Sequence, residues 1–105
     1  MMTINEVVRK CKAALESHYG SQLKGLVLYG SAARHHSNLM SDIDLLILLN
    51  KSFDYFSELR QVIEVLYPIQ LESYWLISAK PVSLHEFEQG KIQLYRNAKR
   101  EGIWM

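Results

Sequence analysis

Residues 26–49 have the sequence LVLYGSAARHHSNLMSDIDLLILL, in which two aliphatic runs enclose a polar segment. The first run predicts a short buried strand over about 25–29. The second run predicts a strand over about 43–49, and its last five residues are too continuously apolar for either face to contact water. We therefore expect this second strand near the centre of a sheet.

Two aspartates, Asp42 and Asp44, flank Ile43 at the beginning of the second strand. Because successive side chains of a strand point to opposite faces, the two carboxylates are expected on one face, with their Cα atoms about 6.5–7 Å apart. Adjacent carboxylates repel each other, and a divalent cation offsets this repulsion. Oxygen ligands of this kind suit Mg²⁺ or Mn²⁺ better than zinc. The pair therefore predicts a metal site.

A glycine–serine pair, Gly30 and Ser31, ends the first strand and leads into a segment with the character of a first helical turn. Glycine lets backbone approach a ligand closely, and the free N–H groups at a helix start favour phosphate. Ser31 adds a hydroxyl and Arg34 adds a fixed positive charge. Ser41 either caps the turn into the second strand or reaches a phosphate. This neighbourhood suits a polyphosphate chelated to Mg²⁺.

Helical periodicity and chain-breaking residues divide the rest of the sequence. The pair Thr3 and Glu6 has capping-box spacing, Pro68 is expected to end a helix, and the pair Lys80-Pro81 is expected to end a strand. The expected elements are a helix from Thr3 to Gly20, strands over about 25–29 and 43–49, a helix from Phe53 to Pro68, a strand over about 69–77 and helices over about 83–90 and 92–100.

Strands separated by helices predict an α/β (α+β) fold with a small mixed β-sheet and helices packed mainly on one face. The other face is then free to carry the acidic residues. A chain of 105 residues with 49% hydrophobic content is long enough for one compact domain and too short for two. We therefore expect a single domain over residues 1–105.

Composition narrows the classes of function. Twelve basic and eleven acidic side chains give a net charge of +1, which disfavours direct binding of long nucleic acid. Cys11 is the only cysteine, so an internal disulfide and a cysteine zinc cluster are excluded. Neither a signal peptide nor a membrane span is expected, and we predict a cytoplasmic protein. The Walker lysine signature and triad-type arrangements of Ser, Cys and His are not found.

The spacing G-S-x10-D-x-D, formed by Gly30, Ser31, Asp42 and Asp44, resembles the signature of the nucleotidyltransferase superfamily that includes DNA polymerase beta. The small size and the tail at 100–103 resemble its smallest branch, the minimal nucleotidyltransferase (MNT) proteins. The resemblance implies the polymerase beta-like nucleotidyltransferase fold. It also implies a phosphate-binding role for Gly30 and Ser31 and metal binding by Asp42 and Asp44.

The resemblance further implies a third carboxylate on a later strand. Glu72 is the only acidic residue in the strand expected over about 69–77, and we assign it to this role. With three carboxylates, the resemblance implies two Mg²⁺ ions and ATP as the nucleotide donor. If Glu72 instead points into solvent, the site has two carboxylates and binds only the metal ion associated with the nucleotide.

Resemblance to MNT proteins implies transfer of a nucleoside monophosphate, AMP from ATP, to a tyrosine hydroxyl of a HEPN-domain toxin, with this chain as the antitoxin. A homo- or hetero-oligomer is compatible with this role. The alternative is a non-catalytic antitoxin or regulatory subunit that neutralises a HEPN partner by complex formation. A third hypothesis, nucleotide transfer to a small molecule such as an aminoglycoside, is weaker because such enzymes generally carry a further domain.

Overall fold

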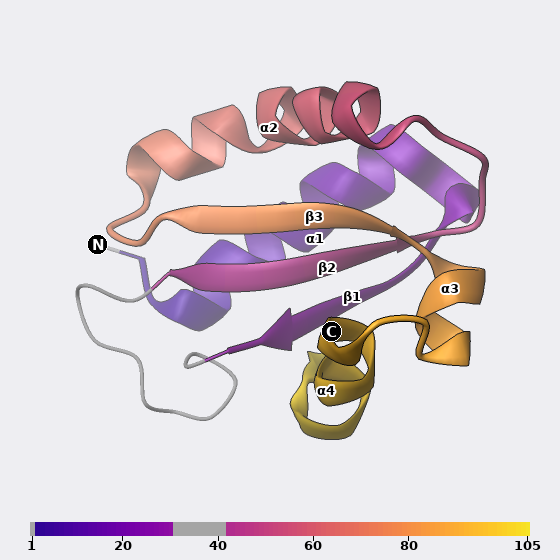
Figure 1. The fold of residues 1–105 in the computed structure, drawn as a ribbon. Helices are drawn as coiled ribbons and strands as arrows, with labels where there is room; N and C mark the ends of the chain where they lie inside the picture. Colours follow the sequence, from indigo (N-terminus) through magenta and orange to yellow (C-terminus); the bar gives the residue numbers. More distant parts are fainter. Residues whose placement is uncertain (1, 31–41) are drawn as a thin grey trace.

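The structure is a computed structural model that describes residues 2–30 and 42–105. Figure 1 shows one sheet with helices on both faces, in the strand order β3-β2-β1-β4. Strand β1 pairs antiparallel with both β2 and β4, whereas β3 runs parallel to β2. The elements are α1 (Ile4–Tyr19), a 3-10 turn (Gly20–Gln22), β1 (Leu23–Tyr29), β2 (Ile43–Leu49), α2 (Tyr55–Glu72), β3 (Ile77–Ser83), α3 (Leu84–Gln89), α4 (Gln93–Glu101) and β4 (Ile103–Trp104).

Strand β2 is one of the two interior strands of the sheet, as its continuous apolar run predicts. Its alternate residues Ile43, Leu45 and Ile47 belong to the hydrophobic cluster formed with α1 and α2. Leu46 and Leu48 belong to a second, smaller cluster on the opposite face, together with residues of α3 and α4. The sheet therefore has a fully covered face under the two long helices and a second face that the short helices α3 and α4 cover in part.

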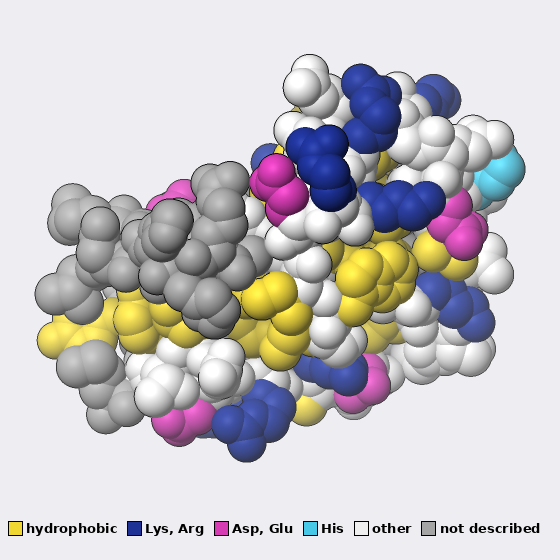
Figure 2. Space-filling view, turned by 90° about the horizontal axis from the view of Figure 1, so that it is seen from below, with side chains coloured by type: hydrophobic (Ala, Val, Ile, Leu, Met, Phe, Trp, Pro, Cys, Tyr) yellow, Lys and Arg dark blue, Asp and Glu magenta, His cyan; other side chains and the backbone are white. Residues whose placement is uncertain are grey.

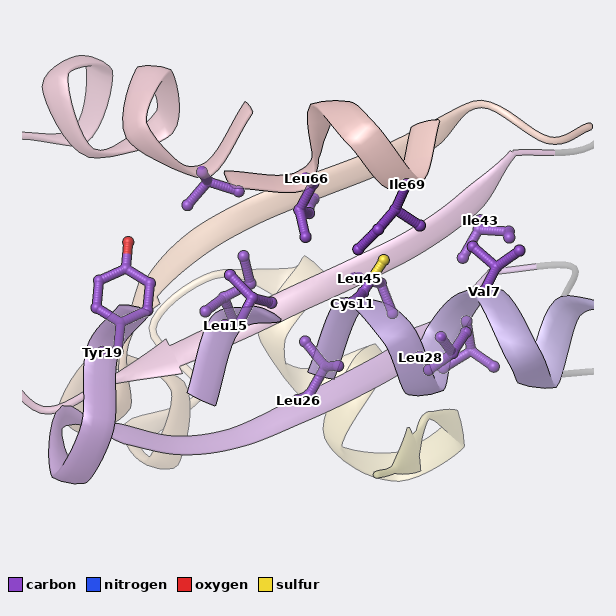
Figure 3. Close-up of a cluster of buried hydrophobic side chains, with 14 of the residues drawn as sticks. Val7, Cys11, Leu15, Tyr19, Leu26, Leu28, Ile43, Leu45, Leu66 and Ile69 are labelled. Carbon is purple, nitrogen blue, oxygen red and sulfur yellow. The ribbon is translucent and has the colours of Figure 1, made fainter. Parts of the chain in front are cut away.

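Helix α1 packs on the sheet through its apolar stripe (Figure 3). The predicted capping box is confirmed, because Glu6 N–H donates to Thr3 Oγ1 and Thr3 N–H donates to Glu6 Oε1. Figure 3 shows the sulfur of Cys11 inside the cluster that this stripe forms with β2 and α2. Because α1 and α2 cover one face of the sheet, a functional site on the sheet must lie on the other face.

Burial of Cys11 leads to a prediction about its reactivity. The side chain has no exposed surface, and burial raises the pKa of its thiol to about 12. Because the thiolate is the reactive form, we expect a disulfide reagent to leave the native protein unmodified and to label one thiol per chain after unfolding in guanidinium. Rapid labelling of the native protein, followed by absorbance, would contradict this packing.

The second long helix does not end at Pro68, as expected from the sequence, but continues to Glu72. Proline inside a helix removes one backbone hydrogen bond, and its ring crowds the preceding turn. Here Val62, Leu66 and Ile69 lie on one face at helical spacing and are all buried in the main cluster. The buried stripe thus continues beyond the proline, and the helix continues with it.

The strand predicted over about 69–77 is therefore wrong in its position along the sequence. The strand β3 occupies residues 77–83 instead. Residues 73–76 form a loop that side chains of neighbouring residues hold in place. Ser73 Oγ bonds to both the N–H and the C=O of Trp75, and Gln70 accepts a hydrogen bond from the backbone N–H of Ile77 at 2.7 Å. The pair Lys80-Pro81 lies inside the strand and does not end it.

Helices α3 and α4 lie against each other on the second face of the sheet. Arg96 donates to Gly90 O at 2.7 Å and Lys99 donates to Glu88 O at 3.0 Å, so basic side chains of α4 bind carbonyl groups at the end of α3. Figure 2 shows Lys and Arg side chains gathered at this end of the molecule. These charges fit a structural role, since cations near a helix C-terminus are favourable.

The predicted fold class is confirmed as mixed α/β, with a four-stranded mixed sheet. The capped start of α3 at Ser83 and its end at Gly90 are also as expected. The two-residue strand β4 was not predicted. Among the described residues, no helix has both the length and the apolar character needed to cross a membrane.

Candidate active site

Asp42 directly precedes β2, and Asp44 is the second residue of that strand, so strand alternation sends the Asp44 side chain to the face opposite α1 and α2. Ile43 between them is fully buried in the cluster under these helices. Asp42 directly precedes the strand and is exposed, whereas Asp44 is half-buried within it. The charge of Asp42 acts on Asp44, so the two carboxylates are close enough to interact. Their role as metal ligands stays a prediction.

The surroundings of Asp44 disfavour its ionised form. Burial raises the pKa of this carboxyl above its usual range, the negative charge of Asp42 raises it further, and the positive charge of Lys80 opposes the rise. A carboxylate held in this way beside a second carboxylate gains from a cation placed between them. Electrostatics and geometry both make the pair a candidate cation site.

Gly30 lies beside Asp44 because Tyr29 is the register partner of Asp44 across the β1–β2 pair. The glycine has a φ of +77°, in the left-handed region that side chains rarely adopt. A Cβ atom added at this position would lie 2.5 Å from Asp44 Oδ2. The absence of a side chain at Gly30 therefore leaves room for the carboxylate.

We predict that Gly30→Ala lowers both stability and ligand binding. The left-handed backbone costs an alanine about 1 kcal/mol, and the new methyl group must also displace the Asp44 carboxylate. Gly20→Ala is the matched control, because Gly20 has a φ of +58° and a Cβ there meets nothing within 4 Å.

Thermal unfolding should show destabilisation of both variants, and Mn²⁺-dependent nucleotide binding should weaken at least about tenfold in Gly30→Ala alone. Equal nucleotide binding by the two variants would contradict the close fit between the glycine and the carboxylate.

Three further residues of the neighbouring strands lie on this face, two from β3 and Tyr29 from β1. Ser78 of β3 is the register partner of Asp44, and Lys80 lies two residues further along the same face. Lys80 Nζ donates to Tyr29 Oη at 3.5 Å, so the lysine side chain crosses β2 to reach β1. Burial, together with the nearby charge of Asp44, raises the pKa of the Tyr29 phenol to about 12.

Sequence reasoning missed Lys80 because the pair Lys80-Pro81 was interpreted as a chain break. The alternation of Ile77, Ala79 and Pro81 with more polar neighbours is the signal that identifies the strand and places Lys80 on the face of Asp44.

Glu72 does not join the two aspartates, which corrects its predicted place on a strand. It is the last residue of α2, a helix that packs on the opposite face of the sheet. Its side chain is 62% exposed and forms an ion pair with Lys10 of α1 at 3.6 Å. The physical reason is the continuation of α2 beyond Pro68, which moves Glu72 from a strand onto a helix.

Three of the predicted phosphate-binding residues, Ser31, Arg34 and Ser41, lie outside the described residues. Next to Gly30, a pocket of about 170 Å³ opens between the end of β1 and α4, with Asn97 and Glu101 among its polar lining residues. A larger cavity of about 400 Å³ lies near the other end of β2, lined in part by Lys51 and Ser83. We take the smaller pocket as part of the site because it adjoins Gly30, which contacts Asp44.

The donor set fits one magnesium ion. Asp42 and Asp44 offer hard carboxylate oxygens, and Gly30 has no side chain that would displace the Asp44 carboxylate. Within the described residues, no group of three or more His, Cys, Asp or Glu side chains is placed to hold a metal. The sequence of 31–41 contains no Asp or Glu. Among the described residues, the third carboxylate that the predicted two-ion site requires is therefore not found grouped with the two aspartates.

Comparisons with known proteins agree on the family and the fold. The family model described as "Polymerase beta, Nucleotidyltransferase" matches residues 9–105. Over 58 residues, the chain is 36% identical to the protein named "Putative protein adenylyltransferase MJ0604" from Methanocaldococcus jannaschii. This match covers 55% of the chain and 58% of that relative, so it spans less than two thirds of the relative's length.

Among solved structures, the chain is similar to one named "Structure of putative minimal nucleotidyltransferase". The TM-score is 0.60 at 19% sequence identity, and the match covers 97% of this chain and 95% of the other. At this level of identity the likeness concerns the fold. It extends over nearly the whole of both chains, including the strands that carry the candidate site.

Proposed function

We propose that this chain transfers AMP from ATP to a hydroxyl group of a protein. The chain belongs to the polymerase beta nucleotidyltransferase family, which supports this proposal. The observation that carries the proposal is the interacting pair Asp42 and Asp44 at the start of β2, with the Asp44 carboxylate beside Gly30. This arrangement provides oxygen ligands for a cation beside a glycine, and the resemblance implies a phosphate-binding role for that glycine and for Ser31.

In the proposed reaction, the acceptor oxygen forms a bond to the α-phosphorus of ATP. The bond from the α-phosphorus to the bridging oxygen of the β-phosphate breaks, and pyrophosphate leaves with that electron pair. The hydroxyl proton passes to water. Mg²⁺ bound by the two aspartates would neutralise charge on the triphosphate. The protein contributes by positioning the donor and acceptor, and no covalent intermediate with the enzyme is needed.

A protein acceptor is supported by two observations. The relative from Methanocaldococcus jannaschii is named a protein adenylyltransferase. In addition, α2 carries Phe56, Ile63, Tyr67 and Leu71 on its surface, each more than half exposed. Exposed apolar side chains gathered on one element are typical of surfaces that contact other proteins. Resemblance to MNT proteins makes a tyrosine of a HEPN-domain toxin the acceptor that we propose, with this chain as the antitoxin.

The test is incubation of the purified chain with Mg²⁺, the HEPN-domain protein encoded beside it and ATP labelled at the α-phosphate. We expect label on a tyrosine of the partner and loss of the partner's ribonuclease activity. ATP labelled at the γ-phosphate is the control and should leave the partner unlabelled, because the γ-phosphate departs with pyrophosphate. Label from the γ-position would indicate a kinase and contradict the proposal.

The lack of an acidic residue on β3 favours a second candidate, a non-catalytic antitoxin that neutralises its partner by binding alone. In the same experiment, this alternative predicts a stable complex and inhibited ribonuclease without label. Inhibition should then need neither ATP nor Mg²⁺. Size-exclusion chromatography of the mixture with and without nucleotide separates the two candidates.

A further inference from the structure

Strand β3 brings a positive charge to the face that carries the two aspartates. Ser78 and Lys80 are the residues of β3 that lie beside Asp44 and Leu46 on this face, and the whole strand, 77–83, contains no acidic residue. Lys80 is half-buried and reaches across β2 to the phenol of Tyr29. Its ammonium group is thus held over the strand that carries Asp44.

We propose that Lys80 takes the place of a second divalent cation, so that the site holds a single metal ion with the triphosphate while the Lys80 ammonium binds a phosphate oxygen. The proposal rests on the proposed nucleotidyl transfer and specifies how this site binds the nucleotide.

The charges of the described residues support this arrangement. Two metal ions held about 3.5–4 Å apart need several carboxylates to offset their mutual repulsion. In the described strands and the residues next to them, the acidic residues are Asp42 and Asp44, and no described group of three or more His, Cys, Asp or Glu side chains is placed to hold a metal. A fixed ammonium close to one of them adds further repulsion against a second divalent ion. The same ammonium is a compact positive charge with three donors, which suits a phosphate oxygen.

Tyr29 holds the side chain of Lys80 in position. Lys80 is on an edge strand, and a flexible lysine side chain loses conformational freedom when it is held in one place. The hydrogen bond to Tyr29 Oη at 3.5 Å, together with the half-buried position of Lys80, limits that freedom before any ligand binds. We therefore assign Tyr29 as a positioning residue that acts through Lys80.

The first test counts metal ions directly. Wild-type protein is titrated with Mn²⁺ in the presence of a non-hydrolysable ATP analogue and followed by electron paramagnetic resonance. We expect one bound Mn²⁺ per chain and the spectrum of an isolated ion. A second tightly bound Mn²⁺ with the spectrum of a spin-coupled pair would overturn the proposal, and this measurement needs no variant to fold.

The second test measures affinity for the same Mn²⁺–analogue complex by calorimetry. Lys80→Gln should weaken binding about 10- to 100-fold, the range expected for a lost charged hydrogen bond to phosphate. Lys80→Arg should recover most of the affinity, and Tyr29→Phe should cause a smaller loss than Lys80→Gln. Lys24→Gln is the matched control, because Lys24 is an exposed lysine at the far end of β1. This variant should bind the Mn²⁺–analogue complex with the same affinity as wild type.

The outcomes separate this inference from the proposed function. Unchanged affinity in Lys80→Gln, with binding still lost in Asp44→Asn, overturns the role of Lys80 and leaves nucleotidyl transfer in place. Absence of label on any protein acceptor, with one Mn²⁺ and a Lys80-dependent affinity, overturns the transfer and leaves the one-ion nucleotide site. Failure of wild type to bind the Mn²⁺–analogue complex overturns both.

Discussion

Asp44→Asn is expected to reduce nucleotidyl transfer by about 1,000-fold, because a metal ligand contributes several kcal/mol of charge stabilisation and each 1.36 kcal/mol corresponds to tenfold in rate. The amide keeps the shape of the side chain and the space beside Gly30, so the loss reports on charge. The measurement is the rate at which α-phosphate label from ATP is transferred to the partner. Retention of more than about a tenth of the wild-type rate would contradict the role of Asp44 as a metal ligand.

The same substitution should make the metal-free protein more stable. The fold raises the pKa of Asp44, mainly through burial and then through Asp42, so folding disfavours the ionised carboxylate. With this sign, the stability linked to Asp44 is present below its unfolded pKa of about 4 and is lost as pH rises through the folded pKa. Asparagine is not subject to this loss.

Thermal unfolding in a chelator should therefore show a higher midpoint for Asp44→Asn than for wild type at pH 7, with the difference shrinking in acid. Glu64→Gln, at an exposed position of α2, controls for the loss of one negative charge and should change stability by less than about 0.5 kcal/mol. A variant that loses activity while gaining stability is the expected signature of a functional carboxylate. Lower stability of Asp44→Asn at pH 7 would contradict the interpretation.

Lys51→Met is expected to have the largest effect on stability outside the apolar core, about 2–3 kcal/mol at pH 7. Glu58 of α2 is only 3% exposed and accepts hydrogen bonds from Tyr19 Oη at 2.5 Å and from Lys51 Nζ at 3.1 Å. Removing the lysine leaves a buried carboxylate with the phenol as its remaining partner. Methionine preserves much of the side-chain volume, so the loss reports on charge.

The pH dependence of this prediction has the opposite sign from that of Asp44. Burial alone would raise the pKa of Glu58, but the hydrogen bonds from Tyr19 and Lys51 and the lysine charge lower it below its ordinary value. Stability from this group is therefore present above the unfolded pKa of about 4.3 and is lost as pH falls through the folded pKa. The difference between wild type and Lys51→Met should shrink from pH 7 to pH 4.

Chemical denaturation of the single variants and of the double variant Lys51→Met with Glu58→Gln provides the control. The double variant buries no unpaired charge, so it should be more stable than Lys51→Met alone. Equal stability of the two would show that the charge of Glu58 is not what makes Lys51 necessary.

The sequence predicted the elements whose local signals agree with tertiary packing. The apolar run of β2, the capping box at Thr3 and the capped start of α3 at Ser83 each combine backbone preference with the face that is buried. The region after residue 66 could not be predicted, because there the two signals conflict. Pro68 indicates an end, while Ile69 continues the buried stripe, and only the packed structure shows that burial prevails.

The candidate site was predictable to the extent that it depends on neighbours in sequence. Asp42 and Asp44 are two residues apart at the start of β2, and the antiparallel pairing of Tyr29 with Asp44 brings Gly30 beside the Asp44 carboxylate. The contribution of β3 depends on a parallel pairing that no local pattern encodes. The prediction that the helix ends at Pro68 thus placed Glu72 on a strand of the predicted site. It also left Lys80 outside any predicted strand.

Strand β3 also influences how this protein behaves at high concentration. It lies at an edge of the sheet, and Ile43 N–H donates to Leu76 O, so the backbone groups of 78, 80 and 82 point to β2 and those of 77, 79 and 81 point to the open side. Pro81 has no N–H and therefore interrupts the row of donors on that open side. A strand from another molecule would leave one of its carbonyl groups unpaired there, which protects this edge against amyloid-like stacking.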